Sequence, residues 1–211
     1  NMGGPMAANL VKAGHTVHGF DPVPAAVEAA EANGIKVFPT AVESVVGAEV
    51  VITMLPSGSI VKTLYAEILP AATSGALFID SSTISVDDAR RINAQANDRG
   101  FAQVDAPVSG GVKGAVAGTL AFMVGGTESA FAAARSTLDP MAGKIIHCGD
   151  SGAGQAAKLC NNMVLAVQQI AVGEAFKLAE KLGLSDQALY DVITGATGNC
   201  WAVQTNCPVP G

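Results

Sequence analysis

One stripe of polar residues runs along an otherwise apolar segment late in the chain. Gln155 lies three residues before Lys158, and Asn162 lies four residues after it. In a helix these spacings place the three side chains on one face. Lys177 and Lys181 are interpreted as surface lysines, whereas Lys158 has alanines, a leucine and a cysteine as its flanks. A lysine whose pKa is lowered by partial desolvation can exchange a proton near neutral pH.

A second group of residues has the chemistry to hold a small carboxylate. Residues 105–111 read Asp-Ala-Pro-Val-Ser-Gly-Gly and follow a short predicted strand. Ser109 supplies a hydroxyl, while Gly110 and Gly111 expose backbone N–H groups without side-chain obstruction. The same residues also fit an ordinary Ser-Gly-Gly turn, and taken alone they favour that alternative.

The start of the chain carries spacing typical of a dinucleotide site. Gly3 opens a predicted helix, and Asp21 follows 18 residues later, directly after a predicted strand. In a dinucleotide-binding unit, an acidic residue about 20 residues on binds the adenosine ribose diol, and the helix N-terminus faces the pyrophosphate. The first strand and the first two glycines of G-x-G-x-x-G are absent, so we expect the chain to begin inside that motif. An unrelated helix start remains the alternative.

The surrounding elements predict an α/β fold. Short apolar runs alternate with alanine-rich helical stretches, which favours a doubly wound, Rossmann-type, mostly parallel sheet. The predicted strands are 16–20, 50–54, 77–80, 103–105, 120–124 and 144–147. The predicted helices between them are 2–13, 25–32, 86–98 and 129–138.

Near residue 150 the pattern changes, which predicts two domains, 1–150 and 151–211. The first is a cofactor-binding domain that lacks its first strand, and the second is the beginning of an all-α domain. A long helix is predicted over 153–182, with Gly183 ending it, and a second over 186–194 with Ser185 as N-cap. Two or three helices make a poor core, so we expect further C-terminal helices or a partner chain. A homo-oligomer formed through the helical domain is the expected assembly.

Composition excludes several classes of function. The net charge is −6 and no basic run occurs, which argues against a nucleic-acid partner. No apolar stretch is long enough to span a bilayer. The four cysteines have spacings of 12, 40 and 7, which match no zinc pattern, and the three histidines show no metal spacing. We therefore expect free thiols and no metal.

Four motifs resemble those of the β-hydroxyacid dehydrogenase family. In order they are Thr-Met-Leu-Pro at 53–56, Asp-Ser-Ser-Thr at 80–83, the 105–111 run, and Gly-Gln-Ala-Ala-Lys-Leu-Cys-Asn-Asn at 154–162. The resemblance covers essentially all 211 residues. It implies an oxidoreductase with NAD as cofactor and a small β-hydroxy acid as substrate. The resemblance implies a cytoplasmic location for a bacterial protein and the mitochondrial matrix for a eukaryotic one. The sequence itself shows no targeting segment that would decide between them.

The resemblance also implies roles for individual residues. Lys158 would be the catalytic acid and base, and Asn162 would hydrogen-bond the reacting hydroxyl or orient the lysine. Asn162 would bind substrate together with Ser109, Gly110 and Gly111. The cofactor-binding residues would be Asn1, Met2, Gly3, Asp21, Leu55, Pro56 and Thr83. Leu55-Pro56 can alternatively be only a strand end, and Thr83 only part of a helix cap.

Two closing segments narrow the resemblance further. Cys200-Trp201 and Pro208-Val209-Pro210-Gly211 resemble the family members that oxidise 3-hydroxyisobutyrate to methylmalonate semialdehyde in valine breakdown. A tartronate or succinate semialdehyde reductase of the same family is one alternative. A cofactor-binding relative without catalysis is another, although such relatives lack the lysine.

Overall fold

The computed structural model describes residues 1–209 and divides into two compact units, which are described separately. Unit 1 is Asn1–Lys158, and unit 2 begins at Leu159. The division falls within a single helix, α8 (Ala153–Leu182), so the last residues of unit 1 form the beginning of that helix. Pro210 and Gly211, which complete the predicted closing segment, lie outside the described residues.

A six-stranded sheet forms the centre of unit 1, in the order β3-β4-β5-β7-β6 with β8 beside β7. The first three strands are parallel, β7 is parallel to β8, and the remaining pairings of β7 are antiparallel. The bounds are β3 Val50–Thr53, β4 Leu77–Asp80, β5 Ala102–Asp105, β6 Val108–Ser109, β7 Leu120–Gly125 and β8 Ala142–Gly149. The predicted α/β class with a mostly parallel, Rossmann-type sheet is confirmed.

The predicted strand 16–20 does not join this sheet. Only β1 (His18–Gly19) forms, and it pairs in parallel with β2 (Lys36–Val37) in a separate two-stranded sheet. Glycine is a poor strand residue, and Asp21-Pro22 follows at once, so the run ends early. The predicted bounds 16–20 were therefore too wide, since the strand is only His18–Gly19.

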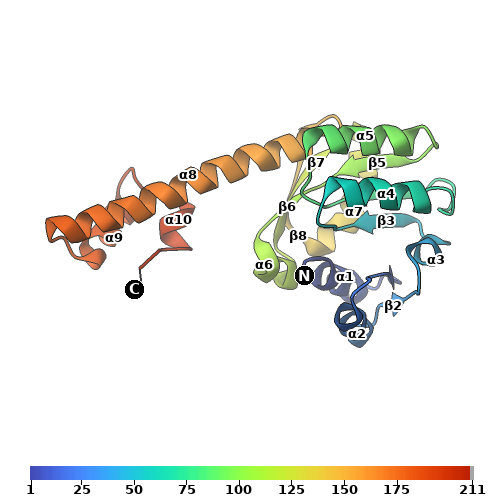
Figure 1. The fold of residues 1–211 in the computed structure, drawn as a ribbon, viewed down its shortest axis with the longest axis horizontal. Coiled ribbons are helices and arrows are strands. Elements are labelled where there is room, and N and C mark those ends of the chain that lie inside the picture. Colours follow the sequence, from blue (N-terminus) through green and yellow to red (C-terminus); the bar gives the residue numbers. More distant parts are fainter. Residues whose placement is uncertain (210–211) are drawn as a thin grey trace. The chain divides into compact units, whose positions relative to one another are not determined.

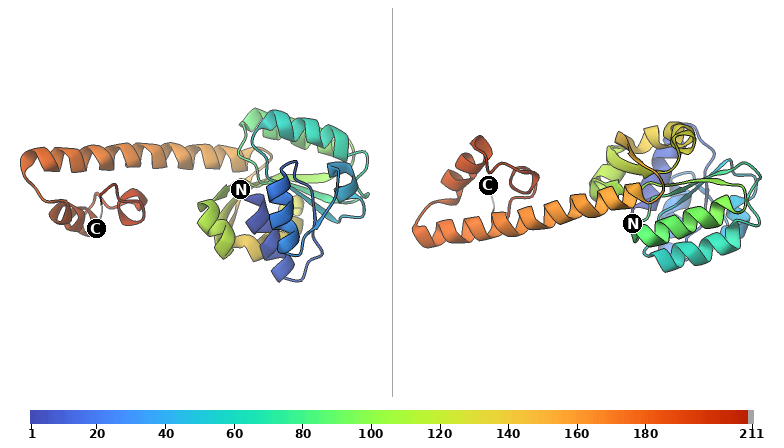
Figure 2. Two further views of the ribbon diagram at one scale, coloured as in Figure 1. Left: turned by 60° about the horizontal axis from the view of Figure 1, so that its bottom comes forward. Right: turned by 90° about the horizontal axis from the view of Figure 1, so that it is seen from above.

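Helices cover both faces of the main sheet, as Figure 2 shows for α4 and α5 on one side and α1 on the other. The first face packs against α1 (Gly3–Lys12), α6 (Gly111–Ala117) and α7 (Glu128–Leu138), the second against α3 (Ala41–Val45), α4 (Gly58–Ile68) and α5 (Val86–Asn97). The remaining helices are α2 (Pro24–Ala32) and a 3₁₀ turn, η1 (Asp139–Met141). Four helices begin after a hydroxyl that accepts a hydrogen bond from the first turn, namely that of Thr40, Ser57, Ser85 or Thr127.

Unit 2 consists of most of α8 followed by α9 (Asp186–Gly195) and α10 (Trp201–Gln204) (Figure 1). The bounds of α8 match the prediction, and Gly183 after it has a φ of 75°. Ser185 accepts a hydrogen bond from the Ala188 N–H, which confirms it as the N-cap of α9. Among residues 1–209, no helix combines the length and hydrophobicity that a bilayer crossing requires.

Candidate active site

Three parallel strands end at the same edge of the sheet with a polar residue each. Thr53 ends β3, Asp80 ends β4 and Asp105 ends β5, and these residues are partners in the strand register. Ligands of open α/β sheets bind outside this carboxyl edge. Because Thr53 pairs with Asp80, the loop with Leu55-Pro56 and the loop with Thr83 begin next to each other at this edge.

Hydrogen bonds beneath this edge hold the two loops together. The Thr53 Oγ1 hydroxyl donates to Asp80 Oδ1 at 2.8 Å, and the Ser82 N–H donates to the same oxygen at 3.1 Å. The Leu55 N–H in turn donates to Ser82 Oγ at 2.8 Å. Asp80 and Ser82 are fully buried, and burial raises the pKa of the Asp80 carboxyl. The loops thus rest on a buried polar layer, while Pro56 and Thr83 themselves are exposed.

The start of α1 lies beside the first of these loops. A methyl group added to Gly3 would stand 3.7 Å from Met54 Cβ, so the helix begins in close approach to the end of β3. Within residues 1–209, the N-cap Met2 makes no side-chain cap hydrogen bond, which leaves first-turn N–H groups of α1 for a ligand. Asn1 is exposed. Asp21 is also exposed, and its Oδ1 accepts a hydrogen bond from the Val23 N–H at 2.9 Å. These groups suit a pyrophosphate and a ribose diol.

The beginning of α8 is anchored on the end of β5. The Asp105 carboxylate accepts the Gly152 N–H at 2.7 Å on one oxygen and the Gln155 N–H at 2.9 Å on the other. Desolvation outweighs these donors and raises the pKa of the Asp105 carboxyl. A Cβ on Gly154 would stand 2.8 Å from the Asp105 carbonyl oxygen, so only glycine allows this approach. The sheet edge and the first turn of α8 are therefore one assembly.

The Gln155 side chain joins α8 to the Thr83 loop. Its Nε2 donates to the Ser82 carbonyl at 2.7 Å, and its Oε1 accepts the Ile84 N–H at 3.1 Å. Only 2% of the residue is exposed. The sequence placed Gln155 on the polar stripe with Lys158 but gave no indication of these partners.

Lys158 lies almost one turn further along α8 and is half-buried. Desolvation lowers the pKa of its ammonium group. Its neighbours Leu159 and Cys160 are exposed, so the apolar flanks account for only part of this burial. Asn162 lies one further turn along the helix and is exposed, and its Oδ1 accepts a hydrogen bond from the Asn161 amide at 3.4 Å. Lys177 is a surface lysine paired with Glu180, as predicted.

The predicted carboxylate-binding run starts a different loop of the same unit. Ser109 ends β6, and β7 separates this strand from β5 in the sheet. Gly110 and Gly111 have φ values of 129° and 62°, a region that other residues rarely adopt, and Gly111 begins α6. The backbone thus explains both glycines without a ligand. Ser109 itself is half-buried, and the described contacts do not join it to the Leu55-Pro56 loop or the Thr83 loop.

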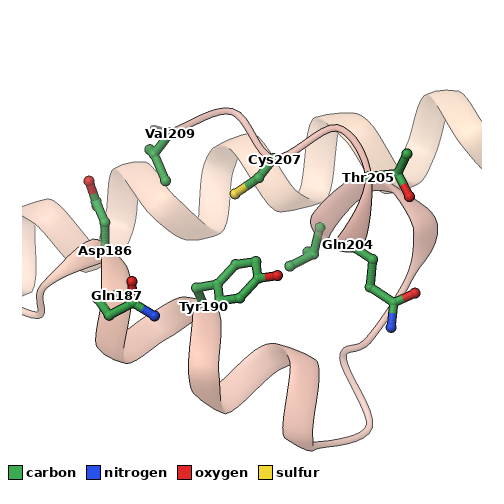
Figure 3. Close-up of a pocket in the computed structure, with 8 residues that line it drawn as sticks. Asp186, Gln187, Tyr190, Gln204, Thr205, Cys207 and Val209 are labelled. Atoms are coloured by element: carbon green, nitrogen blue, oxygen red, sulfur yellow. The ribbon is translucent and has the colours of Figure 1, made fainter. Parts of the chain in front are cut away.

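Two hollows of the surface lie away from this edge of the sheet. One of about 340 Å³ in unit 2 lies between α9 and the segment from Gln204 to Val209 (Figure 3), and it includes none of the predicted site residues. Its lining residues are Asp186, Gln187, Tyr190, Val203, Gln204, Thr205, Cys207 and Val209. Another of similar volume lies on the surface of α4. The candidate site is therefore the open carboxyl edge of the sheet, where the polar groups gather. All four cysteines are free, and residues 1–209 contain no cluster of three potential metal-binding side chains.

Comparisons with known proteins identify the kind of domain in each part of the chain. The family model for the NAD-binding domain of 6-phosphogluconate dehydrogenase matches residues 1–149. The model described as NAD-binding of NADP-dependent 3-hydroxyisobutyrate dehydrogenase matches residues 152–210. Both halves of the chain thus match models of nicotinamide-cofactor dehydrogenases.

Individual relatives point to one branch. The "Probable 3-hydroxyisobutyrate dehydrogenase" of Mycobacterium tuberculosis is 69% identical over 100% of this chain and 72% of its own length. The mitochondrial 3-hydroxyisobutyrate dehydrogenase of Drosophila melanogaster is 46% identical over 100% of this chain and 65% of its own length. A solved structure, "Mycobacterium tuberculosis 3-Hydroxyisobutyrate dehydrogenase (MtHIBADH) + L-serine", has a TM-score of 0.97 and 68% identity, covering 100% of this chain and 72% of that one. The chain therefore belongs to the 3-hydroxyisobutyrate dehydrogenase family, and it is an NAD-dependent oxidoreductase.

Proposed function

We propose that this enzyme oxidises 3-hydroxyisobutyrate to methylmalonate semialdehyde, with Lys158 as the general acid and base. The observation that carries the proposal is the half-buried Lys158, whose pKa is lowered by desolvation, on a helix anchored at the carboxyl edge of the sheet. A neutral amine at that position can act as a base near physiological pH. The relatives named for this reaction support the choice of substrate.

The chain's own residues have distinct tasks in this reaction. The neutral Lys158 Nζ accepts the proton of the substrate hydroxyl as the C–O bond becomes a carbonyl. When bound, NAD would accept the hydride from the carbon that carries this hydroxyl. In the reverse direction the Lys158 ammonium returns the proton to the carbonyl oxygen. Asn162 hydrogen-bonds the reacting oxygen, while Ser109, Gly110 and Gly111 hold the carboxylate.

The cofactor would lie across the loops at the sheet edge. The N–H groups at the start of α1, including that of Gly3, would face the pyrophosphate, and Asp21 would bind the adenosine ribose diol. The Leu55-Pro56 backbone and Thr83 would line the nicotinamide side. The exposure of Asp21 and Thr83 leaves both side chains free to make these contacts.

L-serine is a second candidate substrate. A Pseudomonas aeruginosa relative named NAD-dependent L-serine dehydrogenase is 44% identical over the whole of this chain, and the solved mycobacterial structure also names L-serine. Serine presents the same hydroxymethyl group and carboxylate, with an ammonium in place of the methyl group. No observation favours the tartronate or succinate semialdehyde reductases over these two.

The test is steady-state formation of NADH by the full-length protein with each β-hydroxy acid. We expect the highest kcat/KM with 3-hydroxyisobutyrate, and Lys158→Ala should lower kcat roughly 10²–10⁴-fold while NAD binding survives. Lys158→Arg should not restore the rate, because a guanidinium stays protonated. A higher kcat/KM with L-serine would replace the proposed substrate, and near-normal turnover by Lys158→Ala would reject the mechanism.

A further inference from the structure

Gln155 satisfies both ends of its side-chain amide on the two sides of one residue. Its Nε2 donates to the Ser82 carbonyl, and its Oε1 accepts the Ile84 N–H, so the bonded backbone groups flank Thr83. Thr83 is exposed although its neighbour Ser82 is fully buried. The amide therefore fixes the loop on either side while the Thr83 side chain stays free for a ligand.

The same residue is fixed at its own backbone. The Gln155 N–H donates to the Asp105 carboxylate at 2.9 Å, and Gly152 donates to its other oxygen at 2.7 Å. Three hydrogen bonds thus position Gln155 between the ends of β4 and β5. Lys158 follows it by three residues on α8, a rise of about 4.5 Å along the helix axis.

We propose that Gln155 is a positioning residue that sets the catalytic lysine relative to the loop holding the nicotinamide end of the cofactor. This inference rests on the proposed function, since it assumes that Lys158 and Thr83 act on the two reactants. We call the two side-chain hydrogen bonds of Gln155, to Ser82 and Ile84, the clamp. They are linked to the Leu55-Pro56 loop as well, because the Ser82 hydroxyl accepts the Leu55 N–H at 2.8 Å. A shift of about 1 Å between reacting groups can cost on the order of 10²-fold in rate.

Only a glutamine provides this pair of contacts from this position. An ionised glutamate would keep the acceptor for the Ile84 N–H but would turn a second acceptor toward the Ser82 carbonyl. Asparagine is one methylene shorter and would not reach both groups. Methionine fills similar volume but offers neither a strong donor nor a strong acceptor.

The decisive comparison is between Gln155→Met and Gln103→Met in the full-length protein. Gln103 is also only 2% exposed, and its side chain likewise donates to a backbone carbonyl, that of Val104, and accepts from Asn93. It lies within β5 rather than at the carboxyl edge. The two variants therefore remove the same group from equally buried positions, and both should lower the Tm.

Only Gln155→Met should change catalysis. We expect its kcat to fall about 10–100-fold with little change in KM or in the Kd for NADH. The primary deuterium isotope effect on a substrate deuterated at the hydroxymethyl carbon should increase, because misplacement slows hydride transfer itself. If Gln155→Met does not fold, Gln155→Glu, which keeps one of the two side-chain hydrogen bonds, is measured against Gln103→Glu in the same way. Wild-type kcat and isotope effect in the Gln155 variant, or an equal loss in the Gln103 variant, would overturn the proposal.

A readout that needs no turnover separates this inference from the proposed function. Amide hydrogen exchange of residues 81–85 should be faster in Gln155→Met than in wild type, because the Ile84 N–H loses its acceptor. Exchange of the same segment should be unchanged in Gln103→Met. If wild type does not oxidise 3-hydroxyisobutyrate, the proposed substrate is wrong, and the Gln155 comparison is made with L-serine. Unchanged exchange in Gln155→Met would reject the clamp whatever the substrate.

Discussion

The Lys158 side chain is partly buried, and no neighbouring charge among residues 1–209 contributes to the change in its pKa. Desolvation is the cause of its lowered pKa, so the neutral form is populated at lower pH than for a lysine in water. In the proposed mechanism, oxidation needs this neutral form and reduction needs the ammonium. The kcat for oxidation should therefore rise as pH rises through the lowered pKa, and the kcat for reduction should fall over the same range. Profiles of kcat against pH in both directions test this, and an oxidation rate that declines there would contradict it.

Asp21 should decide between the two nicotinamide cofactors. In the proposed cofactor site its exposed carboxylate would repel a ribose 2′-phosphate, and residues 22–26 include no arginine to relieve the repulsion. We expect kcat/KM with NAD to exceed that with NADP by at least roughly tenfold, equivalent to about 1.4 kcal/mol. Asp21→Ser should narrow the difference, with Asp98→Ser as a control for the loss of an exposed carboxylate elsewhere. Equal efficiency with both cofactors in wild type would show that the charge does not discriminate.

Among the elements, the two buried carboxylates at strand ends have different consequences for stability. Both Asp105 oxygens accept N–H groups, one from Gly152 just before α8 and one from Gln155 within it, whereas Asp80 Oδ2 has no partner among residues 1–209. Asp105→Asn would turn an amide NH₂ toward an N–H, and we expect it to lower the free energy of unfolding by about 1–3 kcal/mol. Asp80→Asn keeps the oxygen that serves Thr53 and Ser82, so it should cost less. Chemical denaturation of both variants measures the contrast, and equal losses would refute it.

The effect of Asp80→Asn on stability should depend on pH with a definite sign. Burial raises the pKa of Asp80 in the folded state above its unfolded value. Such a group stabilises the fold fully below its unfolded pKa and loses this contribution as pH rises through its folded pKa. Asparagine does not titrate, so the stability of Asp80→Asn relative to wild type should increase with pH. A constant difference between acidic and neutral pH would mean that Asp80 titrates normally.

The sequence predicted those elements whose ends are marked by local residues, such as a glycine after a helix. The long helix from Ala153 to Leu182 has no internal proline and ends before Gly183, and both bounds were predicted. Helix α4 was not predicted, because Gly58 at its first position and Pro56 before it are typical of a turn. Tertiary contact explains the glycine, since a Cβ there would meet the Asp88 side chain. Strand β6, at two residues, is too short to give a pattern.

In the candidate site too, local sequence predicted some features, whereas others depend on contacts between distant parts of the chain. The motifs led to the prediction of Lys158, Thr83 and Leu55 as site residues, because each stands in a run with recognisable chemistry. The contacts that position them are not local. The Asp105 carboxylate reaches residues 47 and 50 positions later, and the Gln155 side chain reaches residues 71 and 73 positions earlier. The sequence contained only an indirect signal for these contacts. Asp80 and Asp105 each end a buried strand, and a buried carboxylate is costly unless it accepts hydrogen bonds.

At the scale of the whole molecule, the two units differ in how well they cover their apolar residues. Unit 1 buries two large clusters on the faces of its sheet, whereas the cluster in unit 2 contains only Val172, Phe176, Ala202 and Val203 as buried residues. Large apolar side chains of α8 remain exposed, and they are Leu159, Met163, Val164, Val167, Ile170, Leu178 and Leu182. A contiguous apolar surface of this kind marks a face that packs against another polypeptide segment.

The relatives are longer than this chain, which spans 72% of the mycobacterial one. We therefore expect unit 2 to be the less stable part of a polypeptide that ends at residue 211. Its amides should exchange rapidly there and become protected in a protein extended to the length of its relatives, because the added segments or a second copy would cover α8. Hydrogen exchange on both proteins tests this, with α4, α5 and the sheet of unit 1 as the internal control. The molar mass of the extended protein, measured by light scattering with and without Val167→Asp, distinguishes the two kinds of coverage. If a second copy covers α8, the substitution should lower the mass of the assembly. If a segment of the same chain covers α8, the mass should not change. Equal protection of unit 2 in the short and the extended proteins would show that the small buried cluster of residues 159–209 is sufficient for its stability.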